Sequence, residues 1–217
     1  MPYRKRIHTT VSDEFPTLVT KKAGQNRLVI AAEAARIMST QSLSNYKAAK
    51  QKAAERLGIN LRSSMPSNAE VESALRAYQE IYGGKRHFDH LQKMRKAALG
   101  VMRSLESYSP RLVGPVLEGT ADKHARVTLH VFNDPPDGIV MHLLDKGLVF
   151  RNHQRKIRWH DGTYRQVQLL VTNANDVEVE LTLFNSMDLR QAPPSPIDGR
   201  PQKRAPISQV ARLLANT

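Results

Sequence analysis

The pattern of apolar and polar positions divides the chain into a helical half and a second half that contains strands. Between residues 27 and 107 apolar residues recur every three or four positions, which predicts a series of amphipathic helices. The third of these helices begins with a capping-box pattern, Ser67 followed by Glu70. Its predicted buried stripe consists of Val71, Leu75, Tyr78 and Ile81.

After Pro110 the pattern changes to short apolar runs separated by turn residues. In residues 177–184, Val177, Val179, Leu181 and Leu183 alternate with Glu178, Glu180, Thr182 and Phe184, which is typical of a half-buried strand. The bend at Gly114-Pro115 predicts an interrupted strand. The elements expected in this half are strands at 112–117 and 127–132, a helix at 135–146, and strands at 148–159, 164–172 and 177–184.

These patterns predict an α+β fold in four segments. An all-helical N-terminal region is followed by a mixed or antiparallel sheet with flanking helices. The proline-rich residues 192–206 predict an extended linker, and a short helix at about 207–215 ends the chain. The segments are a flexible basic arm (1–25), a helical region (26–107), an α/β domain (108–190) and a basic tail (191–217).

The distribution of charge indicates a polyanionic partner. The formal net charge is +13 at pH 7. Residues 1–62 carry 12 Lys or Arg and 4 Asp or Glu, whereas residues 63–185 carry 16 and 14. Basic ends on a nearly neutral body favour contact with RNA or DNA. The alternative is a solubilising surface, because charge runs usually mark solvated faces.

Location and membrane contact are predicted from what the sequence lacks. The chain contains no cysteine, which excludes disulfides and thiolate sites and is consistent with a reducing cytoplasm. No run approaches the roughly 18 apolar residues of a membrane-spanning helix. The polar N-terminus lacks the apolar stretch of a secretory signal. We therefore expect a cytoplasmic protein without a membrane partner.

Two groups of basic residues are candidate nucleic-acid contacts. One borders the apolar stripe of the helix at about 44–57, and the other lies on the hairpin at 148–172 beside Phe150, Trp159 and Tyr164. Basic side chains between aromatic ones on a sheet can follow phosphates while the rings stack on bases. The alternative is an ordinary hairpin with aromatic residues in the core. The candidate residues are Lys47, Lys50, Lys52, Arg56, Arg151, Arg155 and Arg158.

Several common motifs are excluded by their residues. Gly114 to Thr120 has two glycines at P-loop spacing, but it lacks the lysine that contacts phosphates. The sequence has neither a Gly-x-Gly-x-x-Gly nor a Gly-x-Ser-x-Gly motif. None of the 8 histidines forms a recognised zinc spacing.

Residues 108–185 resemble the nucleotidyltransferase fold of the polymerase-β-like superfamily. Val116 to Thr120 looks like that family's strand and phosphate-binding turn, and residues 128–131 fall where its Asp-x-Asp metal-binding motif lies. The resemblance implies nucleotide binding by Gly119, Thr120 and Asp122. It also implies that Glu180, or secondarily Glu178, is the third acid and a metal ligand, with Mg²⁺ as cofactor if the site is active. The whole chain is also similar to a group of bacterial proteins.

The departure from this family concerns the metal ligands. Two-metal catalysis needs clustered carboxylates, but Thr128 and His130 occupy the Asp-x-Asp positions. Threonine is a poor anionic ligand, and histidine prefers softer metals than Mg²⁺. We therefore expect a degenerate site in a protein that binds nucleotide or nucleic acid. The alternative is a non-enzymatic nucleic-acid-binding or adaptor protein that uses the fold as a scaffold.

Overall fold

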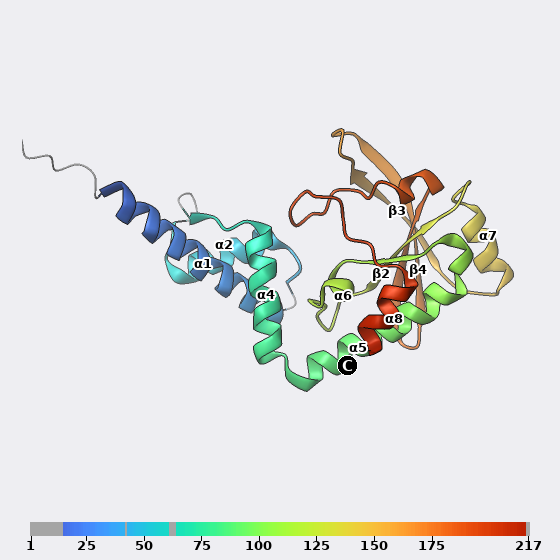
Figure 1. Cartoon of the computed structure of the whole chain (residues 1–217), viewed down its shortest axis with the longest axis horizontal. Coiled ribbons are helices and arrows are strands. Elements are labelled where there is room, and N and C mark those ends of the chain that lie inside the picture. The colour runs from blue at the N-terminus through green and yellow to red at the C-terminus, as the bar shows by residue number, and fades with distance from the viewer. Residues whose placement is uncertain (1–14, 42, 61–63, 216–217) are drawn as a thin grey trace, which may run out of the picture.

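The computed structural model describes residues 15–41, 43–60 and 64–215. The N-terminal helices lie on one side and the sheet with its helices on the other, joined by a long helix (Figure 1). No helix among the described residues is long and apolar enough to cross a membrane. The helices before the sheet are α1 (Phe15–Gln41), α2 (Tyr46–Leu57), α4 (Asn68–Tyr82) and the connecting α5 (Gly84–Ser104).

Helices α1, α2 and α4 share a core of small and branched residues. Its fully buried members are Ile30, Ala34, Ala35, Ile37, Ala49, Ala53 and Val71. The ends of these helices are set by caps that the sequence encodes. The Ser67–Glu70 capping box is formed as predicted, and Gly58 ends α2 in the left-handed conformation that suits glycine.

Two details of the helical part differ from the sequence predictions. Ile81 is 71% exposed, whereas Glu72 and Gln79 are buried. The reason is that the face of α4 toward the rest of the molecule makes polar contacts, such as the hydrogen bond from Gln79 Nε2 to the Thr120 carbonyl. In addition, α1 begins at Phe15, inside the predicted arm, and residues 1–14 lie outside the described part.

The second half contains a five-stranded mixed sheet in the order β1-β2-β5-β4-β3. Only β2 and β5 are parallel within this sheet; the other neighbours are antiparallel. Helix α7 and the β3–β4 hairpin lie between β2 and β5 in the chain. The strands are β1 (Arg111–Val113), β2 (Val127–Phe132), β3 (Arg151–Arg158), β4 (Tyr164–Ala174) and β5 (Val177–Phe184).

Helices cover one face of this sheet. Leu129 on β2 and Leu181 on β5 are fully buried in a core shared with α5, α7 (Gly138–Asp145) and α8 (Ile207–Ala215). Because side chains alternate along strands, the neighbouring residues Thr128, His130 and Glu180 face the other way. That second face therefore positions the candidate site.

The second face is partly closed by an aromatic cluster and by the tail. Phe132, Trp159 and Phe184 pack together at one end, next to the 3₁₀ turn η2 (Ser186–Leu189). From there the chain returns toward α4, as the orange-red segment of Figure 1, and Ala205 then pairs with Leu112 on β1. A second 3₁₀ turn, η1 (Glu106–Tyr108), precedes β1.

The strand predicted at 112–117 is shorter than expected. It ends at Val113, and residues 115–118 form the single helical turn α6 (Pro115–Glu118). Gly114 has a φ of 71°, which turns the chain out of the sheet, and Pro115 then occupies the first helical position, where its missing N–H is tolerated.

Candidate functional site

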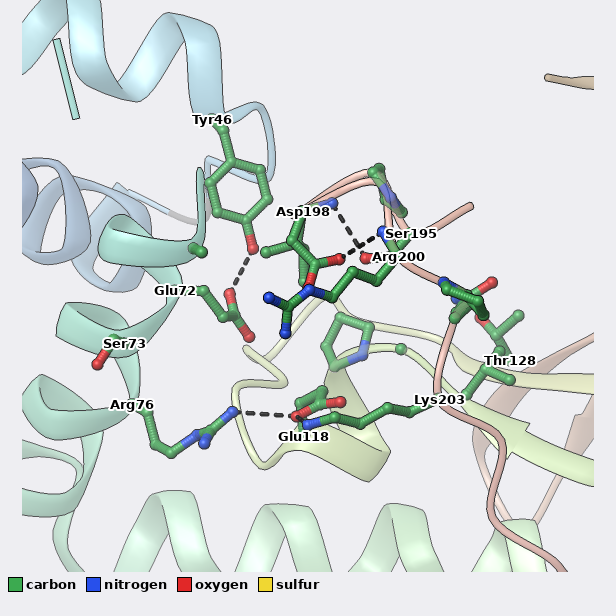
Figure 2. Close-up of a pocket in the computed structure, with 18 of the residues that line it drawn as sticks. Tyr46, Glu72, Ser73, Arg76, Glu118, Thr128, Ser195, Asp198, Arg200 and Lys203 are labelled. Atoms are coloured by element: carbon green, nitrogen blue, oxygen red, sulfur yellow. Dashed lines mark hydrogen bonds and ion pairs between the residues drawn. The ribbon is translucent and has the colours of Figure 1, made fainter. Parts of the chain in front are cut away.

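Two adjoining cavities lie between the helical part and the second face of the sheet. Their volumes are about 530 and 440 Å³, within the range of small-molecule sites. Both are lined by Tyr46, Glu72, Pro115, Thr128 and Arg155. The larger one, which we call the tail cavity, also lies under residues 195–203 (Figure 2).

Thr128 and Glu180 lie side by side at this cleft. They are paired across the parallel β2–β5 ladder. Glu180 is only 5% exposed, and Arg155 from β3 donates to both of its carboxylate oxygens, at 2.9 and 3.0 Å. Arg126 Nη1 lies 4.0 Å from the same carboxylate. The candidate metal ligand is therefore already neutralised by a bidentate guanidinium.

Glu178 is engaged in the same way. It forms ion pairs with Arg126, just before β2, and with Arg151 on β3. Glu178 and Glu180 thus meet three guanidinium groups, which leaves the cluster with an excess of positive charge. An excess of this sign favours an anionic ligand.

His130 follows Thr128 by two positions on β2, but it does not line either cavity. Its Nδ1 accepts a hydrogen bond from Arg204 Nε at 3.0 Å, and its ring lies against Phe184. Burial and the positive charge of Arg204 lower the pKa of His130 to about 3. The side chain is therefore a neutral acceptor that fastens the tail to the sheet.

The residues of the expected metal site do not fit a Mg²⁺ centre. Mg²⁺ requires oxygen ligands, usually carboxylates, whereas Thr128 offers a hydroxyl and the Glu180 carboxylate is bound by Arg155. In the described ranges, no group of three or more Asp, Glu or His residues is arranged to hold a metal ion. The donor set therefore suits a cleft filled by guanidinium groups better than one filled by metal.

The Gly119-Thr120 turn, predicted to bind phosphates, uses its polar groups internally. Both backbone amides donate to the Pro115 carbonyl at 2.9 Å. The Thr120 hydroxyl donates to Glu72 Oε1 at 2.8 Å. A phosphate at this turn would find no free amide there and would meet the Glu72 carboxylate. Asp122, the third predicted nucleotide ligand, lines the smaller cavity, and its Oδ1 accepts a hydrogen bond from the His124 backbone amide at 2.9 Å.

Glu72 instead connects the two halves of the molecule. It is buried and accepts hydrogen bonds from the hydroxyls of Tyr46 in α2 and Thr120 after α6. Gln79, two turns further along α4, donates to the Thr120 carbonyl at 3.2 Å. This contact was not among the features predicted from the sequence. The sequence does contain a sign of it, because Glu72, Leu75 and Gln79 share one helical face and two polar residues therefore lie in a buried stripe.

The basic residues of α2 do not all face solvent. Lys50 is buried, and its Nζ donates to the Pro66 carbonyl at 3.0 Å and to Asn68 Oδ1 at 2.8 Å. Burial lowers the pKa of Lys50. Lys50 is therefore a structural residue and not the predicted nucleic-acid contact. Lys47, Lys52 and Arg56 are exposed.

The predicted hairpin surface is likewise divided. Arg158 and Tyr164 are exposed, but Trp159 is buried in the aromatic cluster with the Arg165 guanidinium 4.1 Å from its ring centre. Trp159 is therefore a core residue, as expected for an ordinary hairpin with aromatic residues in the core. Arg151 and Arg155 are the two residues of the predicted hairpin surface that pair with Glu178 and Glu180.

Further cations reach the tail cavity from elements that the sequence analysis did not connect. Arg76 on α4 and Lys203 in the tail both contact Glu118, at 3.0 and 3.4 Å, and Arg200 lies nearby (Figure 2). The basic, proline-rich composition of the tail was the available signal, but it could not indicate where the segment packs.

The chain was also compared with known proteins. A scan against protein-family models found no matching family, and searches of curated proteins and of solved structures found no significant match.

Proposed function

We propose that this chain is a nucleotidyltransferase-like protein with a degenerate metal site, and that it binds nucleotide or nucleic acid without nucleotidyl transfer. The order of elements supports the relationship. A short strand and turn lead into β2, a helix follows, and β5 then joins β2 in parallel. The resemblance implies this order of elements along the chain, but it implies an antiparallel strand for the third acid, whereas β5 runs parallel to β2.

The observation that carries the proposal is the pairing of Thr128 with Glu180 at the cleft, with Arg155 bound to Glu180. In the related enzymes this position belongs to carboxylates that bind metal. Here the positive charge comes from guanidinium groups, which bind phosphate oxygens through directed hydrogen bonds. This exchange supports binding as the function and gives no support to two-metal catalysis.

Nucleic-acid binding through α2 is tested with its exposed lysines. We expect Lys47→Ala/Lys52→Ala to weaken binding of short RNA and DNA strands uniformly across sequences. Each lost phosphate contact should also reduce the slope of log affinity against log salt by about 0.7–0.9. Fluorescence anisotropy over a salt series measures both quantities.

The matched control is Lys93→Ala/Lys146→Ala, which removes two exposed lysines from α5 and from the end of α7. This variant loses the same net charge but should retain a salt slope close to that of the wild type. Equal slopes for both variants would show that α2 is not the contact surface. Absence of salt-dependent binding in the wild type would contradict the nucleic-acid part of the proposal.

A further inference from the structure

The tail forms a folded hairpin over the larger cavity. Ser195 N donates to the Arg200 carbonyl at 2.7 Å, Gly199 N donates to the Ser195 carbonyl at 2.9 Å, and Pro194 pairs with Pro201. Gly199 has a φ of 73°, which favours glycine at this turn. Residues 193–202, which we call the tail hairpin, are therefore a defined structural element and not an extended linker.

This hairpin is held from both sides of the cleft. Asn68, at the start of α4, donates to the Pro196 carbonyl at 3.0 Å. On the sheet side, Arg204 donates to His130 and to the Asp188 carbonyl, and Ala205 pairs with Leu112. These contacts keep the hairpin over the cavity and position the side chains of Arg200 and Lys203 at its edge.

Four cations line the tail cavity: Arg76 from α4, Arg155 from β3, and Arg200 and Lys203 from the tail. Three carboxylates, those of Glu72, Glu118 and Asp198, line it as well. Arg200 has an 86% exposed side chain and lies 4.0 Å from Asp198, too far for a hydrogen bond. Lys203 is also largely exposed, and its contact with Glu118 is long, at 3.4 Å. These two cations therefore retain donors for a ligand.

The cavity also offers apolar surface beside these charges. The ring of Tyr46 lies at one side, and Pro115, Pro196 and Ile197 contribute further apolar surface. Flat apolar groups next to guanidinium and ammonium groups suit a ligand with a ring at one end and a phosphate at the other. A volume of about 530 Å³ accommodates one nucleotide but not a helix of nucleic acid.

We infer that the tail cavity binds one phosphate monoester attached to a ring, without a divalent metal, with Arg200 and Lys203 as its phosphate ligands. This inference rests on the proposed function and assigns its ligand to the cavity under the tail hairpin instead of the Gly119-Thr120 turn. The monoester is carried either by a free nucleotide or by the 5′ end of a strand, because both present the same group.

The test measures binding of AMP to the full chain by calorimetry in the presence of EDTA. We expect AMP to bind and adenosine to bind at least about tenfold more weakly, because adenosine lacks the phosphate that accepts charge-assisted hydrogen bonds from Arg200 and Lys203. Arg200→Ala/Lys203→Ala should lower AMP affinity at least about tenfold. Arg103→Ala/Lys146→Ala removes one exposed arginine and one exposed lysine elsewhere, and should leave the affinity nearly unchanged.

Competition then distinguishes the two sources of the phosphate. Displacement of AMP by 5′-phosphorylated but not by 5′-hydroxyl RNA assigns the site to strand ends, and failure of both assigns it to the free nucleotide. The inference is overturned if AMP does not bind in EDTA, or if Arg200→Ala/Lys203→Ala binds it as the wild type does. Salt-dependent RNA binding through α2 would survive that result, so failure of this inference is distinguishable from failure of the proposed function.

Discussion

Replacing Arg155 with alanine is expected to lower the free energy of unfolding by about 2–3 kcal/mol. Removing one partner of a buried ion pair costs about 3–5 kcal/mol, because the other charge is left without compensation. Glu180 is almost completely buried, whereas the Arg155 side chain is half exposed and Arg126 remains nearby. These two features place the expected loss below the full range for a buried pair. Urea denaturation followed by circular dichroism measures it.

Two further variants separate this loss from a general effect of removing charge. Arg158→Ala removes an exposed arginine from the same strand and should change stability by less than about 0.5 kcal/mol. Glu180→Gln introduced together with Arg155→Ala should recover part of the loss, since no uncompensated carboxylate then remains. A loss below about 0.5 kcal/mol for Arg155→Ala would mean that the guanidinium does not compensate Glu180.

Acidification is expected to destabilise the protein through His130. The pKa of this residue is about 3 in the folded chain and near 6.5 when unfolded. Between these values the unfolded chain binds a proton that the folded chain does not, so stability falls as the pH falls. The free energy of unfolding that is lost through His130 approaches about 1.4 kcal/mol for each pH unit below 6.5, and the loss stops growing near pH 3.

His130→Asn isolates this contribution, because the asparagine oxygen can still accept from Arg204 but does not titrate. Unfolding by urea at a series of pH values should show a shallower acid loss for this variant than for the wild type. The stability difference between the two proteins should therefore narrow as the pH decreases. Parallel pH profiles would contradict a buried, neutral His130.

Local features of the fold were predictable because neighbouring residues determine them. The capping box at Ser67 and the alternation along residues 177–184 led to elements found in the structure at those positions. The C-terminal helix, predicted at about 207–215, is also present. Each depends on side chains within a few positions of one another, and the mixed α+β class follows from their order.

Features that depend on distant residues could not be predicted in the same way. The parallel pairing of β2 with β5 brings Thr128 next to Glu180 across 52 positions, with an entire hairpin between them. The partner of Glu180 comes from that hairpin, and periodicity cannot indicate which of several arginines on β3 will reach it. Lys50 illustrates the same limit, because only packing against Pro66 and Asn68 distinguishes it from exposed lysines of α2.

The candidate site in the structure differs from the predicted one because it also depends on contacts between distant residues. The resemblance to nucleotidyltransferases predicted a phosphate site at the Gly119-Thr120 turn, but the hydrogen bond from Thr120 to Glu72 links that turn to α4. The tail was expected to be a linker because prolines disfavour regular structure. In this chain the prolines flank a short hairpin that closes a cavity, and this arrangement depends on contacts with Asn68 and Leu112 far away in the sequence.

Binding of nucleotide or nucleic acid without metal-dependent transfer is tested most directly by one assay. The full chain is incubated with labelled nucleoside triphosphates and mixed RNA in Mg²⁺ or Mn²⁺, and AMP and RNA binding are measured in parallel in EDTA. We predict that no label is incorporated with either metal and that binding is retained in EDTA. Metal-dependent incorporation that is lost in Glu180→Ala would contradict the account, because Glu180 would then serve as a metal ligand in spite of Arg155.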